Sequence, residues 1–448
     1  MKKVILSIGL SCVWVCTSWA QEIKHVILVS IDGFRPEFYQ EEQWGTPNLK
    51  QMAKKGVSAN GVRTIFPSVT YPSHTTLSTG TLPHKHGVYY NTTVGENGQP
   101  GEWIYDSKDI KVPTIWEKAK AKGLITASVS WPITLHNTFI DYNLPEIWDF
   151  ERPMDRITPT KLYATPKGLF DEVMTQALGQ IHYNQLNLSS LAMDENLGRS
   201  AAYLIKTYKP NLLTLHLPNT DGAQHSEGRE GEEVARAIAG ADKAIGNIWD
   251  AVVQAGLEKE TLLLVTGDHG FVSTDFSIAP NIWLKEAGLL DRAFFFSTGG
   301  SAVLQVKNPK DQKIVEEVSQ LIRKLPERYQ AMFERIDESL IRARGGETKA
   351  KLALSGKLGY AFSNQSTGEI VTPSKGGKHG YYPNFHEIYT GFVAYGPGLK
   401  AGLVIDELNL EDIPVLISKV LQFEMEEAEG MYLPLFESKK NESKKEGK

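Results

Sequence analysis

Six acids and histidines, spread over about 350 residues, have the types that a two-metal hydrolytic centre requires. They are Asp32, Asp221, His225, Asp268, His269 and His379. Each of the three aspartates comes at or shortly after a short apolar run that is typical of a buried strand. Hard carboxylates mixed with imidazoles are the usual ligands of such centres. The sequence therefore predicts an enzyme with two metal ions at its active site.

Thr70 is the candidate nucleophile. It lies in a compact turn between Pro67 and Pro72. A hydroxyl held at the start of a helix can be ionised by a nearby metal and can then attack a substrate. The alternative is that Thr70 only caps a helix that begins near Pro72, which is a common use of threonine.

Two short motifs carry most of the imidazoles. Asp221 and His225 are four residues apart, so one helical turn would bring both to a common ion, although pairs at this spacing are more often solvated or capping. Asp268 and His269 precede Gly270, and we expect this glycine to let the backbone turn sharply while both side chains point into a crevice. Each motif alone is weak evidence, but their joint presence with Asp32 favours a metal centre.

The elements that would position these residues alternate between strands and helices. Continuous apolar runs predict strands buried on both faces at His25–Ile31, Ala127–Ser130, Leu212–Leu217 and Leu262–Thr266. Helices are expected over Thr46–Lys55 and Glu232–Gln254. This alternation predicts an α/β fold with a doubly wound, mostly parallel sheet, in which ligands bind beyond the carboxyl ends of the strands.

Two regions interrupt the alternation, and we expect both to be cap-like insertions. Residues 135–200 are rich in loops and are expected to cover part of the sheet. Residues 295–365 are expected to form a small α+β insert, with a strand at Ser301–Val306 and a helix around Ile314–Leu325. We assign 21–436 to one catalytic domain and 437–448 to a disordered charged tail.

The first 20 residues have the composition of a secretory signal peptide. Lys2 and Lys3 precede an apolar stretch, and small residues end at Ala20, where cleavage is expected. An uncleaved N-terminal anchor is the alternative, but the stretch is too short for a stable membrane span. Both cysteines, Cys12 and Cys16, lie inside this segment, so the mature chain would have no disulfide and no cysteine ligand. We expect export across the inner membrane into a bacterial periplasm.

Charge argues against a nucleic-acid polymer as partner. The chain has 48 basic and 53 acidic residues, and loss of Lys2 and Lys3 would leave 46 against 53, a formal charge of −7. No basic stripe is present to follow a polyanion. A small phosphate ester held by metal ions remains compatible with this charge.

The motifs together resemble the alkaline phosphatase superfamily, specifically its nucleotide pyrophosphatase/phosphodiesterase (type I phosphodiesterase) branch, as a bacterial secreted member. The similarity runs from about residue 24 to 430. It is carried by Ser30–Arg35, Thr70–His74, Asp221–His225 and Asp268–Gly270, in that order, and is completed by His379–Tyr381. The resemblance implies an alkaline phosphatase-like fold and hydrolysis of phosphodiester or pyrophosphate bonds through a covalent threonyl-phosphoryl intermediate.

The resemblance also implies roles for individual residues. One of two Zn²⁺ ions per chain would be held by Asp221, His225 and His379. The other would be held by Asp32, Asp268, His269 and the oxygen of Thr70, which is also the nucleophile. Asn91 occupies the place of an asparagine that contacts a phosphoryl oxygen, and is therefore expected to be both catalytic and substrate-binding. Zinc rather than manganese or iron rests on the resemblance, because mixed Asp/His ligands suit several metals.

Related families differ from this chain near the nucleophile. Sulfatases carry a Cys or Ser nucleophile and an arginine where this chain has Thr70 and His74. Threonine-dependent monoesterases take a Lys and an Arg from a loop near residue 130, and Ser130–Thr134 contains neither. A less cationic surround favours a diester over the more highly charged monoester. A phosphomonoesterase, a phosphonate hydrolase and a phospholipase C-type enzyme remain alternatives within the superfamily, and a non-catalytic zinc-binding protein is a further one.

One position departs from the branch and concerns the substrate. Nucleotide-cleaving members usually carry an aromatic residue five positions before the metal-binding Asp221, and this chain has His216 there. We expect His216 to contact substrate, and we expect Tyr71 to stack on one face of it. Natural substrate and oligomeric state are left open by the sequence.

Overall fold

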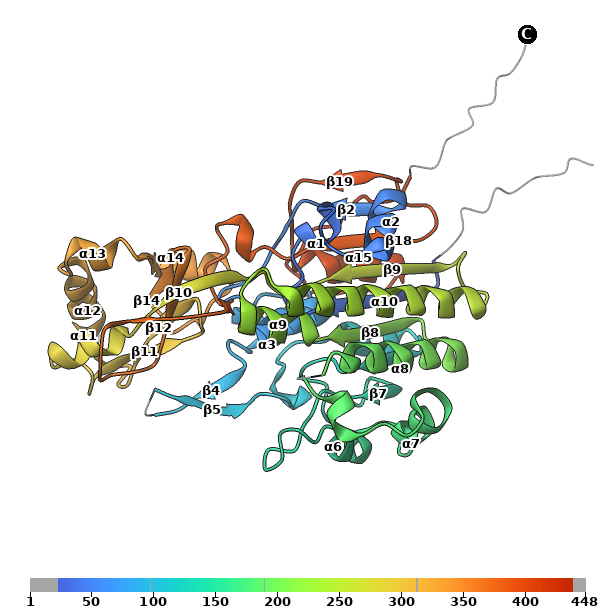
Figure 1. Cartoon of the computed structure of the whole chain (residues 1–448), viewed down its shortest axis with the longest axis horizontal. Coiled ribbons are helices and arrows are strands. Elements are labelled where there is room, and N and C mark those ends of the chain that lie inside the picture. Colours follow the sequence, from blue (N-terminus) through green and yellow to red (C-terminus); the bar gives the residue numbers. More distant parts are fainter. Residues whose placement is uncertain (1–22, 97, 189, 312, 438–448) are drawn as a thin grey trace, which may run out of the picture.

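An eight-stranded, mostly parallel sheet forms the centre of the molecule, which a computed structural model describes over residues 23–96, 98–188, 190–311 and 313–437. The strands lie in the order β19-β2-β18-β9-β1-β8-β6-β7, and only β18 runs antiparallel to its neighbours (Figure 1). Their bounds are β1 His25–Ile31, β2 Val57–Ala59, β6 Thr126–Val129, β7 Tyr142–Leu144, β8 Leu212–Leu217, β9 Thr261–Thr266, β18 Phe392–Tyr395 and β19 Leu403–Ile405. All residues of β1, β8 and β9 are buried, as the continuous apolar runs predict.

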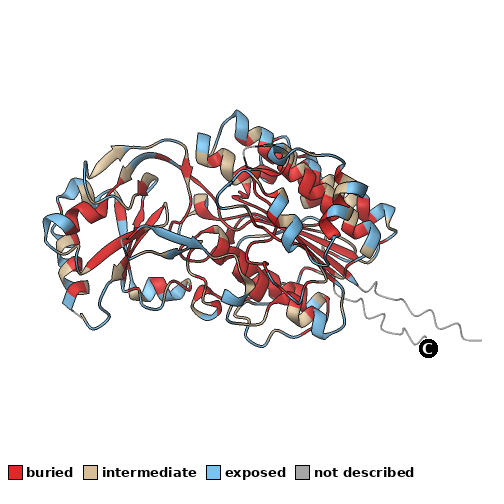
Figure 2. Cartoon of the chain, turned by 90° about the horizontal axis from the view of Figure 1, so that it is seen from below, coloured by how far each residue is buried: buried red, intermediate tan, exposed pale blue. Residues whose placement is uncertain are grey.

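Helices cover both faces of this sheet. One face is covered by α2 (Pro47–Lys55), α7 (Leu169–Val173), α8 (Ala192–Tyr208) and α10 (Glu232–Gln254), whose apolar residues share one core cluster. The opposite face packs against α3 (Thr70–Thr79), α5 (Ile115–Ala121) and α15 (Asp412–Val420). Figure 2 shows the buried strands between these two layers. The predicted doubly wound α/β class is confirmed.

The strands and helices follow the expected bounds closely. The first, third and fourth predicted strands are found as β1, β8 and β9, with β9 one residue longer than expected. Strand β6 begins and ends one residue earlier than expected. Helix α10 has the predicted bounds. Helix α2 begins at Pro47 with Thr46 at the N-cap position, although the Thr46 hydroxyl donates to the carbonyl of Phe38 and not to the helix.

A second, antiparallel sheet stands apart from the central one and forms the α+β insert (Figure 1). Its strands lie in the order β11-β12-β14-β13. The strand and helix bounds are β11 Ala293–Ser297, β12 Ser301–Val306, β13 Phe333–Asp337, β14 Leu352–Gly356, α11 Pro280–Glu286, α12 Lys313–Arg323, α13 Glu327–Gln330 and α14 Glu338–Ala343. The predicted strand is thus β12, and the predicted helix is α12, which packs its apolar face onto this sheet.

A small sheet connects the insert to the centre. Strand β10 (Val272–Ile278) pairs with β15 (Gly359–Phe362), β16 (Val371–Pro373) and β17 (Gly377–Lys378). β10 follows the Asp268 motif directly, and β17 precedes His379, so this pairing brings two distant parts of the predicted site together.

The remaining described segments are short. Residues 135–200 contribute the edge strand β7 and, besides α7 and the start of α8, the helix α6 (Ile157–Tyr163), the single π-helical turn Met174–Leu178 and the 3₁₀ turn Tyr183–Leu186. The others are α1 Glu37–Gln40, α4 Pro83–His86, α9 Asn219–Glu227, β3 Val62–Arg63, β4 Thr92–Val94, β5 Pro100–Trp103, β20 Leu408–Asn409 and the 3₁₀ turns Ser107–Asp109 and His386–Ile388.

Two sequence predictions concern segments that lie mostly outside the described residues. These are the signal peptide, 1–20, and the charged tail, of which only Glu437 is described. Among the described residues, no helix combines the length and the apolar character that are needed to cross a membrane.

Candidate active site

The carboxyl ends of three adjacent parallel strands bring the predicted aspartates together. Asp32 directly follows β1, and Asp268 lies two residues after β9. Asp221 and His225 lie one turn apart on α9, which follows β8, and the His225 Nε2 is 3.4 Å from Asp221 Oδ1. Because β8, β1 and β9 are neighbours in the sheet, their ends meet at one edge.

The imidazoles are oriented by backbone carbonyls. The Nδ1 atoms of His225, His269 and His379 lie 2.9, 3.1 and 3.0 Å from the carbonyl oxygens of Gly377, Gly270 and Ser68, respectively. A carbonyl can only accept, so each Nδ1 carries the proton and each Nε2 presents a lone pair. Burial lowers the pKa of His379 to about 4 and lowers that of His269 well below its usual value, which keeps both rings neutral. Neutral imidazoles with a fixed tautomer are what a metal ion binds.

These lone pairs face carboxylate oxygens that also lack a proton donor. The Nε2 atom of His269 is 3.1 Å from Asp268 Oδ2, and that of His379 is 3.6 Å from Asp221 Oδ1. Three buried oxygens, Asp32 Oδ1, Asp221 Oδ1 and Asp268 Oδ2, have no hydrogen-bond partner. Buried carboxylate oxygens and imidazole nitrogens that face one another without a proton between them are stabilised when a cation binds between them. The residues present therefore fit bound metal ions.

The carboxylates are close enough to oppose one another's ionisation. Burial, and then the charge of Asp221, raises the pKa of Asp32 well above its usual value. Burial and the charge of Asp32 do the same to the pKa of Asp268. A concentration of negative charge in a buried site is compensated most directly by bound cations.

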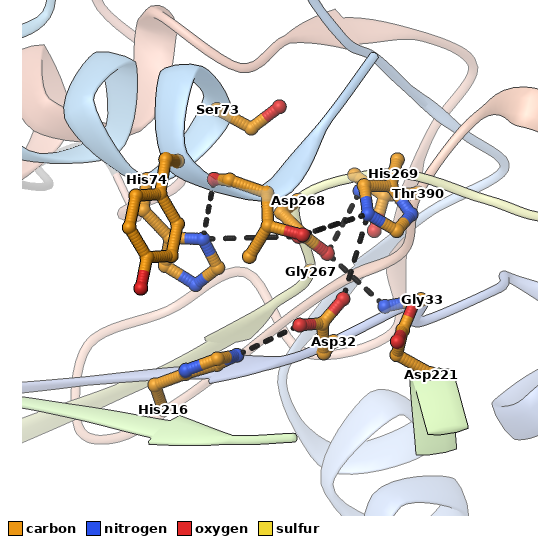
Figure 3. A network of polar contacts seen from close by, with 12 residues as sticks. Asp32, Gly33, Ser73, His74, His216, Asp221, Gly267, Asp268, His269 and Thr390 are labelled. Carbon is orange, nitrogen blue, oxygen red and sulfur yellow. Dashed lines mark hydrogen bonds and ion pairs between the residues drawn. The ribbon is translucent and has the colours of Figure 1, made fainter. Parts of the chain in front are cut away.

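Two sets of potential ligand atoms can be distinguished. Asp221, His225 and His379 form the first set, with ligand atoms within 4.8 Å of one another, as the resemblance implies. The second set by the same distance is Asp32, Asp221 and His269. Asp221 therefore belongs to both sets, while Asp268 joins the second through its contact with His269 (Figure 3).

Thr70 is the first residue of α3, and its hydroxyl does not cap the helix. The N-cap position is taken by Val69, so the helix begins two residues earlier than Pro72 and the capping alternative is wrong. The Thr70 Oγ1 atom lies 3.5 Å from Nε2 of His269, at the edge of the second ligand set. The hydroxyl is therefore presented to the metal-site residues rather than to its own helix.

The first turn of α3 leaves one backbone donor beside Thr70. The Tyr71 N–H donates to Asn91 Oδ1 at 2.9 Å, Pro72 has no N–H, and the Ser73 N–H donates to the Val69 carbonyl. The Thr70 N–H itself is thus the donor that remains, because the first helical N–H groups have no intrahelical acceptor. Since Asn91 uses its oxygen for Tyr71, its amide NH₂ is the end that can still donate to a ligand.

The loop that carries His379 is fixed to the segment that precedes Thr70. Lys378 pairs with Val272 in the β10–β17 ladder, which places the next residue beside the Asp268 motif. The Ser68 carbonyl accepts from His379 Nδ1 and from the N–H of Gly380. Gly380 has φ of +90°, and a Cβ there would lie 1.9 Å from the carbonyl oxygen of Thr298. Residues 311 and 312 positions apart in the sequence are thereby held together.

Gly270 serves the site differently from the sequence prediction. It is not among the residues with a left-handed backbone, so a sharp turn is not its contribution. A Cβ at this position would lie 2.3 Å from the carbonyl oxygen of Glu387 and 2.6 Å from that of Tyr389. Glycine is required here because another segment of backbone packs closely against it.

His216 is hydrogen-bonded between two carboxylates. Its Nε2 is 3.1 Å from Asp32 Oδ2 (Figure 3). Its Nδ1 is 2.9 Å from Glu146 Oε2. Burial opposes protonation of the ring, but the hydrogen bond and charge of Glu146 outweigh it and raise the pKa of His216. With both nitrogens donating, His216 holds Oδ2 of Asp32 and leaves Oδ1, the unpartnered oxygen, toward the second ligand set.

His216 and Tyr71, which the sequence predicts to contact the substrate, both line the cleft. Their polar atoms already form hydrogen bonds within the protein. Tyr71 is 1% exposed, and its hydroxyl donates to Glu146 Oε1 at 3.0 Å. Its ring packs against Trp103, with the centroids 5.2 Å apart. Stacking of Tyr71 on the substrate stays a prediction. The hydrogen bonds of His216 to Asp32 and Glu146 were not indicated by the sequence.

A cleft of about 620 Å³ opens from these residues toward the segment 100–190. Its metal side is lined by Asp32, Thr70, Asn91, Asp221, His225 and His379. Its other wall contains Trp103, Glu146, Trp148, Phe150, Met154, Arg156 and Leu188. Sequence reasoning missed Glu146, Trp148 and Arg156, which follow the short edge strand β7 and carry no spacing signal.

Comparison with known proteins agrees with this fold. The sequence model of the family described as type I phosphodiesterase/nucleotide pyrophosphatase matches residues 26–382. The chain therefore belongs to the type I phosphodiesterase/nucleotide pyrophosphatase family.

Individual relatives are distant in sequence. Ectonucleotide pyrophosphatase/phosphodiesterase family member 3 of Rattus norvegicus is 22% identical over 423 residues, which cover 89% of this chain and 42% of the relative. Family member 7 of Mus musculus is 24% identical over 440 residues, covering 95% and 90% respectively. The chain thus spans less than half of the first relative but most of the second.

Solved structures share the fold. Murine ectonucleotide pyrophosphatase/phosphodiesterase 5 superimposes with a TM-score of 0.67 at 20% identity and covers 91% of this chain and 97% of its own. An inactive threonine-to-alanine variant of the same murine protein, in complex with AMP, also gives 0.67 at 19% identity, with the same coverage.

Proposed function

We propose that this chain is a metal-dependent hydrolase that cleaves phosphodiester or pyrophosphate bonds in small phosphate esters, with Thr70 as the nucleophile. The observation that carries the proposal is the position of the Thr70 hydroxyl, at the start of α3 and 3.5 Å from Nε2 of His269. The family membership of the chain supports the reaction class. The inactive threonine-to-alanine variant of the murine relative supports the choice of nucleophile.

Two metal ions, which we propose to be Zn²⁺, fit the ligand atoms of this site. Asp221, His225 and His379 would hold one ion. Asp32, Asp268 and His269 would hold the other, with the oxygen of Thr70 and a share of Asp221. When bound, the ions supply positive charge that favours the ionised threonine and the developing negative charge on phosphorus-bound oxygens.

The residues of the chain have distinct tasks in the reaction. The Thr70 oxygen attacks phosphorus, the bond to the leaving-group oxygen breaks, and a threonyl-phosphoryl intermediate forms. Water then attacks the same phosphorus, and the Thr70 oxygen leaves and regains a proton. The Asn91 amide and the Thr70 N–H donate to the non-bridging oxygens as charge develops on them. Asn91 is pre-oriented for this by its hydrogen bond to the Tyr71 N–H.

The cleft favours a diester over a monoester. Among the described residues that line it, Arg156 is the single lysine or arginine, and it lies on the aromatic wall beside Trp148. A dianionic monoester would meet no Lys or Arg at the nucleophile itself. The aromatic wall leaves room for a second, organic substituent, and the AMP complex of the murine relative supports a nucleotide-like one. We do not expect a nucleic-acid polymer as substrate.

Phosphomonoester, phosphonate and phospholipid head-group hydrolysis remain the alternative activities of such a site. We further propose export through a signal peptide cleaved near Ala20, into a bacterial periplasm, from the composition of residues 1–20.

The deciding experiment is a rate comparison on purified protein of measured metal content. Bis-p-nitrophenyl phosphate and p-nitrophenyl phosphate release the same chromophore and differ in the charge and substitution of phosphorus. We expect about two zinc ions per chain and a higher kcat/KM for the diester. A preference for the monoester would replace the proposal with a phosphomonoesterase. Bound zinc without turnover of either ester would favour the non-catalytic protein.

A further inference from the structure

Arg156 is a buried cation on the wall of the active-site cleft, and its side chain forms no hydrogen bond with the residues that the structure describes. It is 8% exposed and lies directly before α6. Its Nε atom is buried and unpartnered, and its side chain forms no ion pair among the described residues. Its guanidinium carbon is 5.1 Å from the centroid of the Trp148 ring. Leaving a buried charged donor unsatisfied is costly, which indicates an acceptor that arrives with a ligand.

The nearest acidic group does not satisfy this arginine. Both oxygens of Glu146 already accept hydrogen bonds, one from Tyr71 and one from His216. Burial raises the pKa of Glu146, but His216 and then Arg156 outweigh it and hold that pKa below its usual value. The charge of Arg156 thus offsets that of Glu146, but Arg156 donates no hydrogen bond to this carboxylate. Its N–H donors remain available to a ligand in the cleft.

The position of Arg156 separates it from the reacting phosphorus. Tyr71 directly follows Thr70, and its hydroxyl reaches Glu146, so the length of a tyrosine side chain lies between the nucleophile and this part of the wall. No ion pair or hydrogen bond joins Arg156 to the described metal-site residues. Its neighbours along the cleft include Phe150, Met154 and Leu188, which are large apolar residues 46–49% exposed. A ligand group that reaches Arg156 must therefore belong to the organic substituent of the substrate.

We propose that Arg156 is a specificity-determining residue that binds a second anionic group, a phosphate or a carboxylate, on the organic substituent of the diester. The inference rests on the proposed function and names its substrate class: phosphodiesters whose substituent carries its own negative charge beyond the scissile phosphate. A guanidinium stacked on an aromatic ring and presenting parallel N–H groups recognises such oxyanions in a bidentate manner.

The test uses two chromogenic esters that differ by one anionic group. Thymidine 5′-(4-nitrophenyl phosphate) has a neutral nucleoside, and its 3′-phosphorylated counterpart adds one phosphate. A third ester with a 3′-O-succinyl group adds a carboxylate instead and distinguishes the two sources of charge. We expect the wild-type protein to favour at least one charged ester by about tenfold or more in kcat/KM, through KM, because one charge-assisted hydrogen bond has that effect.

The matched variants are Arg156→Gln and Arg156→Lys. Arg156→Gln should remove the preference and leave kcat/KM for the neutral ester within about threefold, whereas Arg156→Lys should retain part of it. Thermal melting and metal content establish that each variant is folded and loaded. If all three esters lose the same factor in Arg156→Gln, or if the wild-type protein favours the neutral ester, Arg156 is structural and the inference is wrong. Failure of the wild-type protein to hydrolyse any of the three would instead contradict the proposed function.

Discussion

The two sides of the cleft are built in different ways. On the metal side, Asp32, His269 and Asp268 are almost fully buried and follow the ends of central strands, and the three histidines are oriented by backbone carbonyls. On the opposite wall, Trp103 and Phe150 are 37% and 49% exposed and lie at the end of a short strand or in loops. The difference agrees with the proposal that the buried sheet edge carries out the chemistry, while the more exposed wall contacts the variable part of the substrate.

This contrast predicts that substitutions on the two sides of the cleft affect different kinetic parameters. Changes on the metal side should lower kcat or metal content, because the proposed metal ligands and the proposed nucleophile lie there. Changes on the opposite wall should act mainly through KM and should depend on the substrate chosen. The following predictions test this division in order of decreasing effect.

The largest effect is expected for Thr70→Ala. Removal of the hydroxyl eliminates the covalent step, so turnover of bis-p-nitrophenyl phosphate should fall by roughly 10⁴-fold or more. Metal content should stay near two ions per chain, because the carboxylates and imidazoles are unchanged. Thr70→Ser is the matched control and should retain a measurable part of the rate. A Thr70→Ala protein with near wild-type turnover would eliminate the assigned nucleophile.

Asp221→Ala should lower both metal content and activity. Asp221 belongs to both sets of ligand atoms, and its loss should reduce kcat/KM on the order of 10³-fold, with bound metal clearly below two ions per chain. Asp250→Ala, at an exposed position of α10, is the control and should change neither quantity. Elemental analysis after gel filtration gives the metal content. Full metal occupancy in Asp221→Ala would show that the residue is not a ligand.

His216→Phe tests the connection between the two sides. It introduces the aromatic residue that the family resemblance leads us to expect at this position, but it removes the donor that holds Asp32 Oδ2. Loss of such an orienting hydrogen bond should weaken metal affinity about 10- to 100-fold. Asparagine in His216→Asn can replace one of the two donors. The metal affinity of this variant should therefore lie between that of the wild-type protein and that of His216→Phe. Zinc affinity measured against a competing chelator is the readout, and unchanged affinity with improved nucleotide binding would show that His216 serves the substrate instead.

The smallest effect is expected for Trp148→Ala on the opposite wall. Loss of one aromatic contact should raise KM for nucleotide esters about tenfold and leave kcat within about twofold. Trp249→Ala, on α10 away from the cleft, is the control for loss of an indole. Steady-state kinetics with bis-p-nitrophenyl phosphate and with a nucleotide ester separates the two parameters. A large loss of kcat in Trp148→Ala would remove the distinction between the two sides.

Much of the fold was predictable because buried parallel strands have a simple signature. The runs at 25–31 and 212–217 are apolar on both faces, and the 232–254 helix repeats its apolar residues with helical period. Helix starts were less predictable. Helix α3 begins at Thr70, where the Tyr71 N–H donates to Asn91 Oδ1, and not near the proline at position 72.

The residues of the candidate site likewise divide into those that could be predicted from the sequence and those that could not. The ligand types were readable because aspartates and histidines follow strands whose ends must meet, and their roles came from a family resemblance in motif order. Glu146 and Arg156 could not be recognised from the sequence, because both lie in a loop-rich region. Glu146 is defined by its hydrogen bonds to Tyr71 and His216, which are 75 and 70 residues away. Arg156 is defined by its position beside the Trp148 ring on the same wall of the cleft.

The amino-acid sequence by itself determined which residues could bind metals, which hydroxyl could attack, and which strands would gather them. Only the tertiary structure decided that Thr70 is the first residue of its helix, that each histidine presents Nε2, and that His216 connects Asp32 to Glu146. The physical reason is that the types of residues and the spacing of the apolar ones indicate which residues are buried. A hydrogen bond between distant residues depends instead on how the whole chain packs.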